Sequence, residues 1–324
     1  MTGDFFLTNW FLEAMRWIYS LTCAISESGF GNVFLTILIS TILLRALTIF
    51  SDIKTRKSSA KMAEVQPEIQ RLQKKYANDP RRFQAEQTKL MKEKGVSMWG
   101  CLPMLITMPL FFCFIAAFRY WGYEMNLRLL VDENAMELFK SFKFLWINNI
   151  WQPDNGLTPV LANGASFLAT PQLSNLLYLQ EPGVGEKLVE MGLAVTKVYQ
   201  GGVSYQLLSN ETAIAIYDAA IQPFLDVYKG YNNGWFIMSI LAGGTNFLSA
   251  WLMTKNTPAA NEEAAKSTKW MNYLFPVMSF IFCLNYNAAF AIYWTLTSVI
   301  MIIVNLILNK KFPRTEPAKE DANK

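Results

Sequence analysis

Arg45 is the residue whose chemistry and surroundings are most unusual, because it stands inside a long apolar stretch of the chain. Residues 33–50 number 18, about what a helix needs to cross the hydrocarbon layer of a membrane. A charge near the centre of such a helix costs roughly 2.5 to 3.5 kcal/mol, so the side chain should face protein, water or a bound ligand. Thr41, Thr48 and Asp52 lie at helical spacings from it, which predicts one polar helix face. The alternative is that Arg45 extends to the nearest lipid headgroups.

Conventional catalytic chemistry has little support in the sequence. The chain has no histidine, so the commonest metal ligand and general base are missing. Its four cysteines, Cys23, Cys101, Cys113 and Cys283, lack the paired spacing of a zinc or redox motif. We also find no phosphate-binding loop. The sequence therefore predicts a protein that is not an enzyme and that uses neither a metal nor a cofactor.

The composition indicates a membrane protein that crosses the bilayer several times. Of 324 residues, 52% are hydrophobic and only 17% are charged. Residues 1–28 are expected to form an amphipathic helix in the membrane interface. Its predicted apolar face contains Trp10, Phe11, Trp17 and Ile18, and its polar face contains Arg16.

A basic helical hairpin is predicted after the first apolar stretch. Residues 51–97 contain 12 basic and 6 acidic residues, which favours the cytoplasmic side of a membrane. Val65, Ile69, Leu72 and Tyr76 repeat at helical spacing, Asn78–Pro80 supplies a turn, and Phe83 and Leu90 follow seven residues apart. We expect two helices with a thin apolar seam and a basic exterior suited to anionic lipid or ribosomal RNA.

The predicted fold class is an all-α membrane protein with five transmembrane helices, an external N-terminus and a cytoplasmic C-terminus. The expected segments are span 1 at 29–50, the cytoplasmic hairpin at 51–97, span 2 at 98–119, an extracellular segment at 120–234, span 3 at 235–253, a cytoplasmic loop at 254–269, span 4 at 270–286, span 5 at 288–308 and a cytoplasmic tail at 309–324. In the extracellular segment we expect turns at 152–156 and 181–185 and one amphipathic helix over 213–228.

Three functions are compatible with one buried cation and several polar residues in such a bundle. A positively charged, partly hydrated groove suits an anionic or peptide-like ligand, such as the backbone of an unfolded polypeptide. The same arginine would also serve an anion channel or a small-solute transporter, although no repeated halves are evident. The third possibility is a structural assembly factor that acts through the hairpin.

Two blocks of sequence favour one of these three functions. The first is LLRALTIFSDIKTRKSSAKMAEVQPEIQRLQKKYANDPRRF with KLMKEKGVSMWGCLPMLITMPLFF, and the second is FPVMSFIFCLNYNAAFAIYWTLTSV. Both resemble the YidC-type membrane protein insertases, the bacterial relatives of the Oxa and Alb insertases. The resemblance covers about residues 29–119 and 235–309. It is closest to the short form that has no large periplasmic domain before the first span.

The resemblance implies a hydrophilic, polar groove in which an arginine attracts the acidic external tail of a substrate. By position, the implied groove residues are Arg45, Thr41, Thr48, Thr107, Asn246, Tyr293, Trp294 and Ser298. Thr107 stands where many relatives have glutamine, and Asn246 stands at a polar position of the third span. Ile49 and Asn287 replace prolines that are common in relatives.

The implied partners are nascent membrane proteins, the Sec translocon, the ribosome, the signal recognition particle system and anionic lipids, with no DNA. The implied location is the plasma membrane of a bacterium. The resemblance also implies insertion that needs no energy source of its own.

Overall fold

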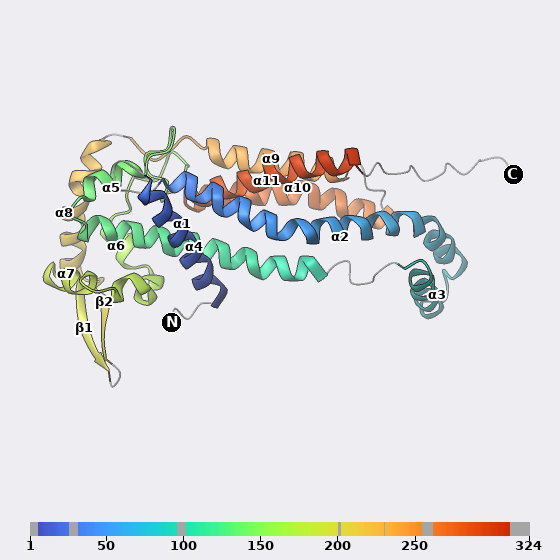
Figure 1. Ribbon diagram of the computed structural model, residues 1–324, viewed down its shortest axis with the longest axis horizontal. Coiled ribbons are helices and arrows are strands. Elements are labelled where there is room, and N and C mark those ends of the chain that lie inside the picture. The colour runs from blue at the N-terminus through green and yellow to red at the C-terminus, as the bar shows by residue number, and fades with distance from the viewer. Residues whose placement is uncertain are drawn as a thin grey trace. The chain divides into compact units, whose positions relative to one another are not determined.

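The computed structural model (Figure 1) describes residues 6–25, 32–95, 102–199, 202–229, 231–254 and 262–311. The main helices are α1 Phe6–Ala24, α2 Val33–Lys75, α3 Pro80–Glu93, α4 Leu102–Val131, α5 Ala135–Ser141, α6 Gly164–Leu168, α7 Val184–Glu190, α8 Glu211–Val227, α9 Ile237–Thr254, α10 Glu262–Asn285 and α11 Ala288–Lys311. Two short 3-10 helices, η2 Pro171–Asn175 and η3 Leu177–Gln180, lie between α6 and α7.

The chain divides into two compact units. The first contains residues 1–41, 110–242 and 280–295, and the second contains residues 42–109, 243–279 and 296–324. Helices α2, α4, α9, α10 and α11 each contribute residues to both units.

The protein is mainly helical, as predicted, but the all-α assignment is wrong in one place. Strands β1 Ala194–Tyr199 and β2 Gly202–Leu207 form a two-stranded antiparallel sheet in which Val198 pairs with Val203. The strands are rich in valine and tyrosine, residues that favour extended backbone. The predicted turn near residue 181 is followed by α7, and the predicted amphipathic helix is present as α8.

Among the described residues, one helical stretch is long and apolar enough to cross a membrane, Ala288–Ile307 in α11. Three shorter apolar stretches occur at Val33–Ala46, Ile237–Leu252 and Tyr273–Asn285, where spans 1, 3 and 4 are predicted. The side chains of residues 102–108, in predicted span 2, lie outside the description. The fifth predicted span thus has the expected length, and the count of five stays a prediction.

Helix α1 is present as predicted, but its apolar side chains divide between two faces. Phe11, Met15 and Ile18 are buried, whereas Trp10 and Trp17 are 50% and 63% exposed. Two ring contacts join the buried face to α4, one between Phe11 and Phe114 at 4.4 Å and one between Tyr19 and Trp121 at 5.7 Å. The helix therefore packs against α4 on one side. Trp10 and Trp17 remain exposed on another side.

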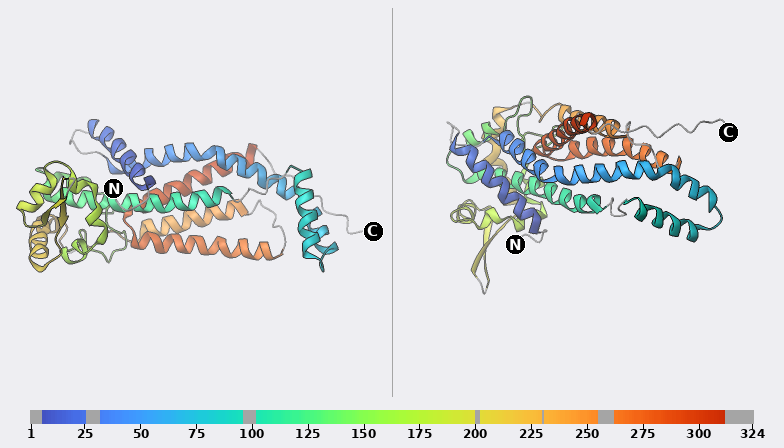
Figure 2. Two further views of the ribbon diagram at one scale, coloured as in Figure 1. Left: turned by 90° about the horizontal axis from the view of Figure 1, so that it is seen from below. Right: turned by 45° about the vertical axis from the view of Figure 1, so that its right-hand side comes forward.

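Two helices joined by a turn are present where the hairpin is predicted, but the first of them is the continuation of α2, which runs from Val33 to Lys75 across the predicted end of span 1. Val65 and Ile69 of α2 are buried with Met91 of α3, and Phe83 and Leu90 pack against them. Asp79 begins α3 by accepting a hydrogen bond from the amide of Arg82 at 3.1 Å. Figure 2 shows α3 folded back beside the end of α2. The seam is thin, so most of the basic side chains face outward.

Candidate functional site

Arg45 lies on α2 in the second unit, where its side chain is half-buried. Its Nε atom is buried and has no hydrogen-bond partner among the residues that the structure describes. A buried guanidinium donor that lacks an acceptor is costly, so an incoming acceptor gains from meeting it. Thr48, three residues further on, donates its hydroxyl to the carbonyl oxygen of Arg45 at 3.2 Å. The site predicted at Arg45 therefore contains an unused, charged donor.

Asn246 of α9 is connected to α10 through Ser279, which is not among the predicted groove residues. The Asn246 amide nitrogen donates to Ser279 Oγ at 3.0 Å, and Ser279 donates to the carbonyl oxygen of Phe275 at 2.7 Å. Ser279 is only 1% exposed. Ser279 is the polar residue in the stretch FPVMSFIF. A polar residue inside a predicted span indicates a hydrogen bond to a neighbouring helix, so the sequence did contain a signal for this contact.

The other predicted groove residues divide between the units. Ser298 of α11 is buried in the second unit, whereas Thr41 belongs to the first unit and already donates its hydroxyl to the carbonyl oxygen of Ile37 at 2.6 Å. Tyr293 stacks on Phe114 with ring centroids 4.8 Å apart. Trp294 meets the Phe290 ring edge-on at 5.4 Å, also within the first unit. The side chains of Thr107 and Asp52 lie outside the described residues.

Tyr293 and Trp294 lie on a helix whose start is fastened by Asn287. The Asn287 side chain accepts a hydrogen bond from the amide of Phe290 at 3.0 Å and donates to the carbonyl oxygen of Phe118 at 2.9 Å. It therefore caps α11 and also holds that helix against α4. These contacts show what asparagine does at a position where the resemblance implies a proline.

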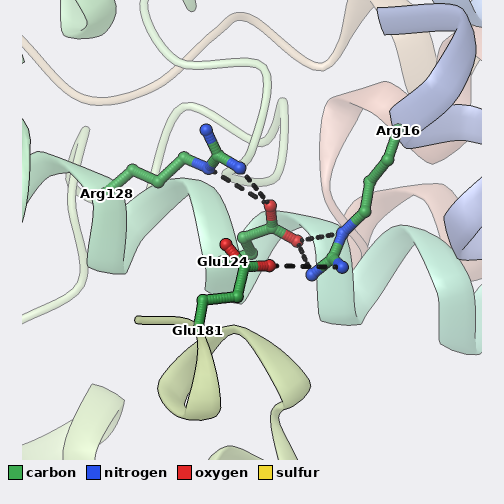
Figure 3. Close-up of polar contacts among 4 residues, drawn as sticks. All are labelled: Arg16, Glu124, Arg128 and Glu181. Atoms are coloured by element: carbon green, nitrogen blue, oxygen red, sulfur yellow. Dashed lines mark hydrogen bonds and ion pairs between the residues drawn. The ribbon is translucent and has the colours of Figure 1, made fainter. Parts of the chain in front are cut away.

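A buried ionic cluster in the first unit was not predicted. Figure 3 shows Glu124 of α4 between Arg16 of α1 and Arg128 of α4, with Glu181 beside Arg16. Glu124 is fully buried, and both of its carboxylate oxygens accept hydrogen bonds. Its Oε2 atom accepts from Arg16 Nε at 2.7 Å and from Arg16 Nη2. Its Oε1 atom accepts from Arg128 Nε at 3.1 Å and from Arg128 Nη2 at 2.9 Å. The cluster joins helices that are 108 residues apart in sequence.

The cluster also influences the pKa values of Arg128 and Tyr178. Burial alone would lower the pKa of Arg128, but the charge and hydrogen bond of Glu124 together with the nearby Tyr178 and Glu181 outweigh it, so that pKa is raised above the usual value. The Arg128 guanidinium lies 4.9 Å from the centre of the Tyr178 ring. Burial raises the pKa of the Tyr178 phenol to about 12, although the charge of Arg128 acts in the opposite direction.

This shift predicts a specific alkaline sensitivity. The Tyr178 pKa is higher in the folded protein than in the unfolded chain, where it is about 10. Its contribution to stability is therefore complete below pH ~10 and is lost as the pH rises towards ~12. We expect the Tyr178→Phe variant to lose less stability than the wild type over that interval, as followed by circular dichroism during chemical unfolding. Equal losses of stability in the two proteins would contradict a raised pKa for Tyr178.

A second polar network holds the start of α9. Asp154 is fully buried and accepts hydrogen bonds from the amides of Trp235 and Met238 at 2.5 and 2.7 Å and from Trp146 Nε1 at 3.2 Å. A side chain at Gly234 would collide with Asp154, with a Cβ only 1.8 Å from its Oδ1 atom, and the backbone there has a positive φ of 76°. The network fixes the direction in which α9 begins.

Within the described residues, no group of three or more Cys, Asp or Glu side chains is arranged to hold a metal ion. The charged groups described above lie at Arg45 in the second unit and around Glu124 in the first.

Comparison with known proteins defines the family. The model of the 60Kd inner membrane protein family matches residues 25–316, so the chain belongs to that family. Two of the most similar relatives are named membrane protein insertase YidC: the protein from Clostridium perfringens is 32% identical over 180 residues, and the one from Clostridium tetani is 32% identical over 163 residues. These alignments cover 55% and 50% of this chain and 69% and 64% of the relatives. The YidC protein of Oceanobacillus iheyensis is 36% identical over 106 residues, or 31% of this chain and 41% of that protein.

The predicted family is thus confirmed, and with it a bacterial inner-membrane protein of the YidC insertase family.

Proposed function

We propose that the chain inserts nascent membrane proteins by guiding their apolar segments and short external tails from the cytoplasm into the bilayer through a polar groove centred on Arg45. The observation that most directly supports this proposal is the buried Arg45 Nε atom, which has no acceptor among the described residues. Family membership supplies the class of activity. The fold would then have five spans, with the N-terminus outside and the C-terminus in the cytoplasm.

The proposed groove lowers the cost of moving polar residues through an apolar layer. An ion pair about 4 Å apart in a medium of effective dielectric near 20 is worth on the order of 4 kcal/mol, before the cost of removing water. This is sufficient to hold an acidic tail briefly. The inserted helix then gains roughly 0.8 kcal/mol for each CH₂ group that it buries in lipid, which favours release. The cycle needs no hydrolytic step.

The exposed apolar side chains of the helices fit a surface that faces lipid. On α10 and α11, Trp270 is 64% exposed, Val277 54% and Ile303 51%. A protein surrounded by water rarely exposes so many large apolar residues. The short apolar stretch Val33–Ala46 around Arg45 also suits a locally thinned bilayer, which would shorten the path of a polar tail.

The basic hairpin formed by α2 and α3 is the proposed contact for the ribosome, the signal recognition particle system and anionic lipid. Arg82 and Lys94 are exposed on it, with side-chain exposures of 77% and 49%. The exposed charges favour phosphate groups without reading a sequence. Cooperation with the Sec translocon belongs to the same proposal.

Site-specific crosslinking tests the proposal against the anion-channel alternative. A photoreactive residue placed at Asn246 or Trp294 should crosslink to a ribosome-bound nascent chain that is halted during insertion, whereas the same residue at the exposed position Leu157 should not. Anion flux through proteoliposomes that Arg45→Ala abolishes, without any crosslink from position 246 or 294, would instead support a channel. Loss of all activity on deletion of residues 59–92, with silent groove variants, would support an assembly factor.

A further inference from the structure

A cleft in the external segment lies at the start of α9, away from Arg45. Its volume is about 610 Å³, and it lies entirely within the first unit. The residues that line it include Lys143, Trp146, Tyr231, Trp235 and Phe236. The volume falls in the range of ordinary small-molecule sites, which is roughly 300 to 1,000 Å³.

Aromatic side chains at the rim of this cleft are turned outward. Tyr231 and Trp235 are 69% and 67% exposed, and Phe236 is 36% exposed. Phe236 has a positive φ of 66°, a conformation that bulky residues rarely adopt and that persists only where the surroundings enforce it. The Asp154 network holds the amides of Trp235 and Met238 on either side of this residue. The fold thus maintains an exposed aromatic rim that packing alone does not require.

Lys143 is the one charged side chain among the described residues that line the cleft. Lys143 lines it and is exposed, and the described lining residues include no carboxylate. The nearest acidic group in the network, Asp154, is fully buried, and its oxygens already accept from two amides of the α9 region and from Trp146 Nε1. It therefore neutralises the helix terminus and leaves the charge of Lys143 for a ligand.

The apolar rim continues directly onto α9. Beyond Phe236, the side chains of Ile237, Ile240 and Leu241 are 37%, 59% and 40% exposed, all in the first unit. Helix α9 lies in the predicted third span, so these three apolar side chains would face the acyl chains of the lipids. A ligand that fits a cleft of this kind has an anionic head beside Lys143 and an apolar body along the start of α9. Tryptophan and tyrosine prefer this boundary between headgroups and hydrocarbon.

We propose that this cleft binds an anionic phospholipid, with the phosphate at Lys143 and the glycerol and upper acyl chains against Tyr231, Trp235 and the first residues of α9. The bound lipid would anchor the external segment to the membrane surface at the base of α9. This site is distinct from the Arg45 groove and does not depend on the insertion mechanism.

The test uses the full chain in vesicles of phosphatidylcholine that contain a minority of photoactivatable phosphatidylglycerol, with the reactive group near the glycerol. Labelled peptides are mapped by mass spectrometry. We expect labelling around Trp235, competed by unlabelled phosphatidylglycerol and not by inorganic phosphate. Lys143→Gln should reduce it about fivefold, since a single lysine at a membrane surface contributes about that factor. The matched control is Lys140→Gln, an exposed lysine three residues earlier that does not line the cleft.

Trp235→Ala provides a second variant, because that side chain is mostly exposed and its loss should leave the fold intact. It should reduce labelling at residues 237–241 while the unfolding midpoint stays that of the wild type. Unchanged labelling in Lys143→Gln, equal loss in Lys140→Gln, or complete competition by inorganic phosphate would each overturn the proposal. Competition by a soluble peptide with an acidic tail would do so as well, because it would assign the cleft to polypeptide.

Discussion

Replacing Arg45 by alanine should reduce insertion of a substrate with an acidic external tail by about 10- to 100-fold, since a hydrogen bond to a charged group contributes roughly 1.5 to 3 kcal/mol. The physical reason is the loss of a buried cation whose Nε atom has no acceptor among the described residues. Arg45→Lys keeps the charge and should retain much of the activity, with some loss because lysine cannot present a planar fork of donors. The measurement is protease protection of the substrate tail in proteoliposomes.

Lys197→Ala is the control for that experiment. Lys197 lies on β1 and is exposed. It belongs neither to the proposed groove nor to the basic hairpin, so insertion should remain close to that of the wild type. Equal insertion by wild type and Arg45→Ala would count against a groove that depends on its charge.

Replacing Glu124 by alanine should produce the largest loss of stability, about 3 to 5 kcal/mol, because removing one partner of a buried ion pair leaves the other charges uncompensated. Arg16 and Arg128 both direct guanidinium groups at this single carboxylate, and Arg16 is the ionic connection of α1 to α4 (Figure 3). Glu124→Gln keeps the shape and removes the charge, so its cost should be smaller. The measurement is the free energy of chemical unfolding in detergent micelles, followed by tryptophan fluorescence.

The control within the cluster is Glu181→Gln. Glu181 has 44% of its side chain exposed and approaches Arg16 only to 3.6 Å. Its replacement should cost less than about 1 kcal/mol, as for other exposed pairs. If Glu124→Ala and Glu181→Gln unfold at the same denaturant concentration, the buried carboxylate does not hold α1 against α4.

Much of the helical framework could be predicted because its signals are local. The spacing of Val65 and Ile69 and the turn at Asn78–Pro80 depend on residues close together in the chain, and the structure has a buried seam and a helix start at these positions. The helix at α8 was also expected from its periodicity. The sheet at residues 194–207 was missed although its valine-rich runs flank two glycines, a pattern that favours a hairpin.

Other features could not be derived from local patterns. Arg16 was assigned to a solvated polar face of α1, but it pairs with Glu124, which is fully buried. Nothing near either residue indicates a partner 108 positions away. In the same way, the sequence places Asp154 in a predicted turn and gives no sign of its partner. In the structure, Asp154 accepts a hydrogen bond from the amide of Trp235, 81 residues further along the chain. Such long-range polar contacts arise from the tertiary fold.

The most direct test of the account is a double-mutant cycle between Arg45 and the acidic tail of a substrate, measured as the inserted fraction in proteoliposomes. Arg45→Ala, neutralisation of the tail and both changes together are compared with the wild-type pair. If Arg45 holds the tail electrostatically, the double change should cost little more than either single change. Strictly additive losses, or wild-type insertion of the acidic tail by Arg45→Ala, would contradict the role of Arg45 as the charge that receives the tail.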